Sequence, residues 1–168
     1  MSLVAYHNDQ AVKEKYLVRV RAHEKADEII RGTYWEKGKG CAVGCTVHSG
    51  NHNAYESELG IPEWLAILED RLFEGMQNGD SKKFPAEFLE AIPVGANLKP
   101  VKWKFVAYLM RENIDRVLSL TVDEKLKTQV VAAIRGVLSL HDSATASGEW
   151  NESAAWSAWS AAWSAARS

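Results

Sequence analysis

The chain has 168 residues, of which 46% are hydrophobic and 25% charged, the ordinary composition of a globular protein. A chain of this length buries enough surface to fold without disulfides or a structural metal ion. Its 20 basic and 22 acidic side chains give a net charge of −2, which argues against nucleic-acid binding. Because residues 1–10 lack a secretory signal pattern and no apolar run approaches the roughly 20 residues of a membrane span, we predict a cytoplasmic protein.

Apolar residues recur at helical spacing along most of the chain. This pattern predicts helices over residues 11–31, 62–76, 85–92, 101–118 and 123–141. Asn78-Gly79-Asp80 predicts a turn, and Thr121 with Glu124 has the spacing of a capping box. The glycine-rich stretch 32–60 has no clear pattern, and strand signals are nearly absent. We therefore predict an all-α fold, a compact array of five to seven helices with a tryptophan-rich helix at the C-terminal end.

The periodicity also predicts which side of each long helix is buried. Between residues 101 and 141 the expected buried positions are Val101, Phe105, Tyr108, Leu109, Val117, Leu118, Leu126, Val130, Ile134, Val137 and Leu138. Residues 143–152 are rich in small and polar side chains and predict a linker. The expected organisation is a helical domain over 1–142, this linker, and a low-complexity helix over 153–168.

Three of the seven tryptophans form a regular series near the C-terminal end. Trp156, Trp159 and Trp163 step by three and then four residues, so their indoles should form one seam along a helix. We expect this tryptophan seam either to pack on the helical domain or to pair with a second copy of the chain, giving a homo-oligomer. Membrane-surface binding is disfavoured because Arg167 is the only charged residue of 153–168.

The stretch 41–52 combines thiols and imidazoles, the side chains that bind zinc and other divalent metal ions. Cys41, Cys45, His48 and His52 are spaced so that a continuous helix would carry them on one side. A single ion could reach all four only if the chain turned back, because a straight helix separates the first from the last by about 16 Å. Ser49-Gly50-Asn51 could supply that turn. A smaller alternative uses His48 and His52 with Glu56 for zinc or manganese.

Two other interpretations of this stretch stay open. Gly40 and Gly44 lie four residues apart among small residues, a spacing that suits close packing with buried thiols. Alternatively the protein is a thiol enzyme in which Cys45 is the nucleophile, His48 or His52 the base, and Glu56 or Glu58 the group that orients the imidazole.

Two segments carry a resemblance to known proteins. They are Gly40-Cys41-Ala42-Val43-Gly44-Cys45-Thr46-Val47-His48 and Tyr55-Glu56-Ser57-Glu58-Leu59-Gly60-Ile61-Pro62. Together with the Ala/Ser/aromatic tail, they resemble a family of uncharacterised proteins from bacteria and their phages. The resemblance implies a bacterial or prophage origin and no particular activity. The leading functional hypothesis is a helical protein that packs or self-associates through its tryptophan seam; the alternative is a metal-dependent or thiol enzyme.

Overall fold

The computed structural model describes residues 3–165, except for the side chains of residues 78, 162, 164 and 165. The chain forms two compact units, Met1–Leu98 (unit 1) and Lys99–Ser168 (unit 2). The structure divides the chain after Leu98 instead of after residue 142, because one helix runs unbroken from Glu124 to Ser147 and shares a unit with its neighbours.

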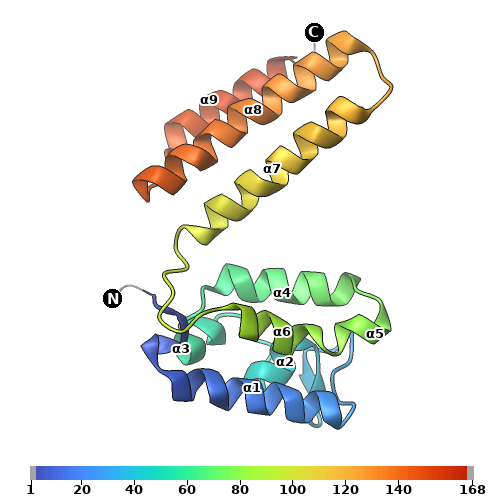
Figure 1. Ribbon diagram of the computed structural model, residues 1–168, viewed down its shortest axis with the longest axis vertical. Helices are drawn as coiled ribbons and strands as arrows, with labels where there is room; N and C mark the ends of the chain where they lie inside the picture. The colour runs from blue at the N-terminus through green and yellow to red at the C-terminus, as the bar shows by residue number, and fades with distance from the viewer. Residues whose placement is uncertain (1–2, 166–168) are drawn as a thin grey trace. The chain divides into compact units, whose positions relative to one another are not determined.

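Apart from one short hairpin, the regular elements of unit 1 are helices (Figure 1). In chain order its elements are a 3-10 helix η1 (Ala5–Asn8), α1 (Gln10–Lys25), β1 (Trp35–Glu36), β2 (Lys39–Gly40), α2 (Ala42–Val47), α3 (Ala54–Leu59), α4 (Glu63–Gly75), α5 (Asn78–Ser81) and α6 (Phe84–Ala91). Helices α4 and α6 match predicted helices, whereas α1 ends at Lys25, six residues before the predicted end at residue 31. The predicted turn at 78–80 is instead the start of the short helix α5.

The short helix α2 is the centre of unit 1. All six of its residues are buried, and it packs against α1, α4 and α6 (Figure 1). Neighbouring elements can enclose a helix on every side only if its side chains leave room for them. Ala42 and Gly44 leave that room in α2 because they are small. The surrounding core consists mainly of Tyr6, Tyr16, Val20, Tyr55, Leu59, Ile61, Phe73 and Leu89.

The stretch 32–60, which has no clear pattern in the sequence, holds short elements, several of which end at residues in the left-handed conformation. β1 and β2 form a minimal hairpin across Lys37 and Gly38, which both have positive φ as a two-residue hairpin turn requires. His48 ends α2 and Gly60 ends α3, again with positive φ. Apart from this hairpin and one isolated bridge, residues 3–165 contain no strand, so the all-α prediction is confirmed.

Unit 2 consists of α7 (Val101–Ser119), α8 (Glu124–Ser147) and α9 (Glu152–Ala165), with α8 packed against both neighbours. The start of α8 differs from the predicted capping box, because the side chain of Asp123 rather than Thr121 accepts the backbone N–H of Leu126. The predicted linker 143–152 is also too long. α8 continues to Ser147 and ends at Gly148, since the alanines and serines of this stretch are compatible with a helix.

The core of unit 2 is small. Among the described side chains of this unit, the buried apolar ones are those of Ala107, Ile114, Val131 and Ala144. Several positions that the periodicity predicts to be buried are exposed, among them Tyr108 (56%), Leu118 (49%) and Leu126 (52%). The periodicity correctly marks apolar faces on α7 and α8, but three helices offer too little surface to cover those faces.

Candidate functional site

The loop that precedes β1 is pressed against α2, and glycines make this approach possible. A Cβ atom on Gly40 would lie 2.1 Å from the carbonyl oxygen of Tyr34, and one on Gly44 only 1.5 Å from the same oxygen. A Cβ on Gly50 would meet the Tyr34 side chain at 3.0 Å. The spacing of Gly40 and Gly44 therefore reflects close packing, one of the interpretations that the sequence left open.

Both cysteines take structural positions in this packing. Cys41 is the N-cap of α2, and its Sγ accepts the backbone N–H of Gly44 at 3.5 Å. Cys45 Sγ donates to the carbonyl oxygen of Gly40 at 3.3 Å. Burial raises the pKa of each thiol to about 12, and Asp70 beside Cys41 acts in the same direction. A nucleophilic cysteine needs a thiolate near neutral pH, so this environment disfavours the thiol-enzyme hypothesis.

Alkylation of the native protein tests this conclusion. We expect iodoacetamide at pH 8 to modify Cys41 and Cys45 roughly a hundredfold or more slowly than a free model thiol, because both sulfurs are buried and protonated. Mass spectrometry of the two peptides gives the rates, and the same reaction in denaturant should restore the rate of the model thiol. A native rate equal to that of the model thiol at either cysteine would show an accessible thiolate there.

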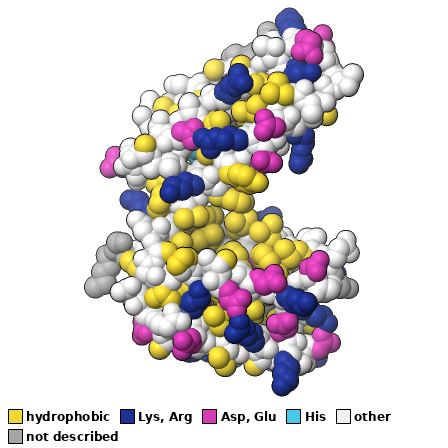
Figure 2. All heavy atoms as spheres, viewed as in Figure 1, with side chains coloured by type: hydrophobic (Ala, Val, Ile, Leu, Met, Phe, Trp, Pro, Cys, Tyr) yellow, Lys and Arg dark blue, Asp and Glu magenta, His cyan; other side chains and the backbone are white. Residues whose placement is uncertain are grey.

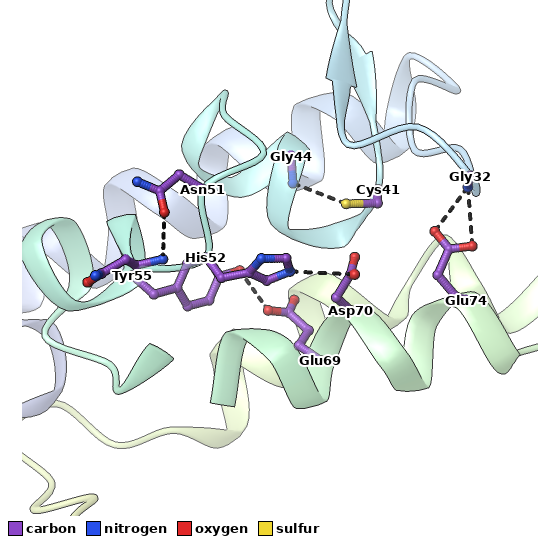
Figure 3. Close-up of polar contacts among 10 residues, drawn as sticks. Gly32, Cys41, Gly44, Asn51, His52, Tyr55, Glu69, Asp70 and Glu74 are labelled. Atoms are coloured by element: carbon purple, nitrogen blue, oxygen red, sulfur yellow. Dashed lines mark hydrogen bonds and ion pairs between the residues drawn. The ribbon is translucent and has the colours of Figure 1, made fainter. Parts of the chain in front are cut away.

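Cys41 and His52 do not form a common metal site, and both lie beside Asp70 of α4 (Figure 3). His52 Nε2 lies 3.5 Å from Oδ2 of Asp70, whose other carboxylate oxygen is buried without a hydrogen-bond partner. One turn further along α4, Glu74 accepts the backbone N–H of Gly32 at 3.0 Å. A pocket of about 210 Å³ opens between α4 and the loop before β1, and it is lined by Gly32, Thr33, Tyr34, Asp70 and Glu74. It is acidic, because Asp70 and Glu74 both face it.

A buried carboxyl group lies beside this pocket, next to Asp70 in the chain (Figure 3). Glu69 is fully buried, and its Oε2 accepts the hydroxyl of Tyr55 at 2.6 Å. Oε1 has no hydrogen-bond partner. Burial raises the pKa of Glu69 to about 8, and the negative charge of Asp70 adds to the effect of burial. Glu69 is therefore mostly protonated at neutral pH and belongs to the core.

His48 lies in a different place, at the surface where α1 and α2 end. Its Nε2 is 2.8 Å from Nε2 of His23, whose Nδ1 contacts Oε2 of Glu28 at 2.6 Å. The indole of Trp35 stacks on the His48 ring, with 4.4 Å between the ring centroids and 12° between the planes. The chain thus brings together two histidines, a carboxylate and a tryptophan from four separate segments.

The predicted four-ligand site is not formed. The chain does turn after His48, but the turn places His52 beside Asp70 and leaves Cys45 bonded to a backbone carbonyl. Glu56 accepts the backbone N–H of Glu63 at 3.0 Å and so caps the start of α4. Within residues 3–165 no group of three or more His, Cys, Asp or Glu side chains could hold a metal ion.

The sequence interpretation passed over four residues that the fold brings to these two places: His23, Trp35, Glu28 and Asp70. No spacing signal could have found the first three, because they come from α1, β1 and the loop between them. Asp70 and Glu74 do share one face of α4 at a spacing of four residues. That signal is weak, since most such acidic pairs on helices are solvated.

The tryptophan seam is formed as predicted along α9 and is open to solvent. Trp156, Trp159 and Trp163 are 69%, 54% and 53% exposed. Successive ring centroids lie 5.1 and 5.9 Å apart, with interplanar angles of 32° and 17°. The neighbouring Trp150 contacts His141 of α8 instead, at 4.9 Å between ring centroids. The seam is thus a row of indoles on one face of one helix.

Comparisons with known proteins add no relative. No family model matches the chain, and neither the curated proteins nor the solved structures contain a significant match. The resemblance to bacterial and prophage proteins therefore remains a prediction. Across the described part of the chain, no helix combines the length and the apolar character that a membrane crossing requires.

Proposed function

We propose that this protein functions by self-association, and that two copies join through the tryptophan seam of α9. The supporting observation is that one helix presents three indoles, each more than half exposed. A buried indole removes roughly 200 Å² from water, and each Å² contributes about 25 cal/mol. Covering the three exposed faces would therefore stabilise a complex by several kcal/mol.

The rest of unit 2 supports the same proposal. Most of the large hydrophobic side chains that are exposed among the described residues belong to this unit: Tyr108, Leu109, Leu118, Leu120, Val122, Leu126, Val130, Trp150, Trp156, Trp159 and Trp163. Figure 2 shows hydrophobic side chains open on the visible face of α7 and α8. An apolar patch of this extent on a unit with a small core is typical of a protein–protein interface.

Unit 2 also carries a groove that can receive an indole. A pocket of about 380 Å³ between α7 and α8 is lined by Met110, Asn113, Val117, Ala133, Ile134 and Val137. All but one of these side chains are apolar. Unit 2 therefore presents both projecting aromatic side chains and an apolar recess, which are complementary surfaces.

The charge pattern of α9 favours a second copy over other occupants. Between Glu152 and Ala165 the only charged residue is Glu152, so the helix offers nothing to select a basic or acidic protein or an anionic lipid surface. A second copy brings the same seam and the same groove. Two such copies can meet about a twofold axis with each seam against its partner's unit 2, and the interface is then self-complementary.

Replacing all three seam tryptophans by alanine tests the proposal. We expect the wild-type chain to dimerise with increasing concentration and the triple variant W156A/W159A/W163A to stay monomeric, with its dimer dissociation constant raised at least a hundredfold. The reason is the loss of several kcal/mol of apolar burial. Sedimentation velocity over a wide concentration range measures the assembly state. Val18→Ala in unit 1 is the matched control, since Val18 is 67% exposed and lies outside the seam.

Two outcomes would contradict self-association through α9. One is a wild-type chain that remains monomeric at every concentration. The other is a triple variant with a lower unfolding temperature and an unchanged mass, which would show that the seam packs within its own chain. Alanine preserves the helix, so loss of α9 itself does not confuse the result.

A further inference from the structure

The side chains of His23 and His48 meet at the surface of unit 1 although 25 residues separate them along the chain. His23 lies in the last turn of α1, and His48 is the C-cap of α2. His48 has a φ of 53°, a left-handed conformation that non-glycine residues adopt infrequently. The two helix ends therefore aim both imidazoles at one point.

The distance between the rings is close to that of two ligands on one metal ion. The two Nε2 atoms lie 2.8 Å apart. Imidazole nitrogens bind zinc at about 2.0–2.1 Å, so two ligands at a tetrahedral angle are separated by about 3.3 Å. If the two rings moved apart by roughly half an ångström, an ion would fit between them. Small rotations of the two side chains can supply this movement.

Neighbouring groups hold both rings in this orientation. His23 Nδ1 donates to Oε2 of Glu28 at 2.6 Å, which leaves the lone pair of its Nε2 facing His48. A carboxylate that accepts the distal N–H of a histidine is the usual partner of metal-binding imidazoles, because it fixes the tautomer. Trp35 stacks on His48 and meets His23 edge-on at 5.4 Å, so neither ring turns freely.

The local charges permit a cation at this point. Glu28 contacts His23 directly, and Glu58 lies close enough to His48 for its negative charge to act on the pKa of that imidazole. Arg19 is the opposing positive charge, but its guanidinium donates to the carbonyl oxygen of Thr46 at 2.8 Å. Burial, followed by the charges of Arg19 and His23, lowers the pKa of His48 below its usual value. The two rings are therefore surrounded by two carboxylates and by one arginine whose guanidinium is bonded elsewhere.

We propose that His23 and His48 form a surface site for a divalent transition-metal ion of the zinc, nickel and copper class. Imidazole is a suitable ligand for these three ions and a poor one for magnesium or calcium. Two protein ligands leave the remaining coordination positions to water or to donor atoms of another molecule. The affinity should therefore be modest and should follow the order copper above nickel and zinc. The proposal is independent of α9 and of self-association.

Calorimetric titration of the full chain, purified without an affinity tag, with zinc, nickel or copper ions tests the site. We expect one ion per chain, and we expect His23→Gln and His48→Asn each to weaken binding at least tenfold. Asparagine tolerates the left-handed conformation of residue 48, so this variant should fold. His52→Gln is the matched control, because His52 faces Asp70 instead, and it should change the affinity less than twofold.

Fluorescence supplies a readout that places the ion. Copper ions quench the fluorescence of nearby indoles, so copper binding should quench the fluorescence of Trp35. The variant Trp35→Phe should lose that part of the quenching, while calorimetry should still detect copper binding. Three results would overturn the proposal. They are wild-type binding weaker than about 1 mM, unchanged affinity in both histidine variants, and quenching that Trp35→Phe leaves intact. In any of these cases the histidine pair is only a structural contact between α1 and α2.

Discussion

Replacing Gly44 by alanine is expected to destabilise unit 1 by about 3 kcal/mol or more, the upper end of what overpacking a core costs. The new Cβ would lie 1.5 Å from the carbonyl oxygen of Tyr34 and 2.7 Å from its carbonyl carbon. These are backbone atoms, so no side-chain rotation relieves the overlap. The loop must leave α2, and this exposes a helix whose six residues are all buried.

Denaturant unfolding followed by circular dichroism measures this loss, and amide hydrogen exchange shows whether α2 and α4 open. Gly75→Ala is the matched control in the same unit, because apart from the adjoining residues and the backbone of its own helix no atom lies within 4 Å of the position that its Cβ would take. It should be neutral or stabilise slightly, by up to about 1 kcal/mol. If Gly44→Ala unfolds like Gly75→Ala, the loop is not packed against α2 as described.

Glu69→Gln is expected to change how the stability of the protein depends on pH. The pKa of Glu69 is about 8 in the folded state, against 4.5 for the exposed group. Between these values the unfolded chain loses the proton and the folded chain keeps it, so the stability that this group contributes is complete below pH 4.5 and is lost as pH rises toward 8. The loss is on the order of 4 kcal/mol. Glutamine cannot ionise, and it still accepts the hydroxyl of Tyr55.

Urea unfolding of both proteins at pH 5, 6.5 and 8 measures the effect. The variant should resemble the wild type at pH 5 and become the more stable protein at pH 8. Glu87→Gln controls for the loss of one negative charge, because Glu87 is exposed on α6. Parallel curves for wild type and Glu69→Gln over this range would mean that the buried carboxyl does not titrate as described.

The sequence predicted the helices because helical periodicity is a local property. α1, α4, α6, α7 and α8 follow from the spacing of apolar residues, and the tryptophan seam follows from steps of three and four. The short helices α2, α3 and α5 were not predicted, since elements of four to six residues show too few repeats for a periodicity to be detected. They are stabilised by burial and by end residues such as His48 and Gly60 rather than by their own propensity.

The exposed faces of α7 and α8 show a second limit of periodicity. The pattern of Leu118, Leu126 and Val130 identifies an apolar face correctly. Whether such a face is buried in its own unit depends on how much surface the other helices can cover, and in unit 2 they cover little of it. The exposure of these apolar faces contradicts the burial prediction, and it also favours self-association.

The helical class and the tryptophan seam of α9 follow from the spacing of residues along the chain. Close packing at Gly40 and Gly44 was one of several interpretations of the sequence, and the fold supports it by placing the carbonyl oxygen of Tyr34 against both glycines. Which chemical groups meet depends on the folded chain as a whole: His48 meets His23 and Glu28, and His52 and Cys41 meet Asp70. Spacing along a chain reports which residues share a face of one helix. Contacts between α1 and α2, or between the 41–52 stretch and α4, depend on how the helices pack, and packing is decided by the whole core at once.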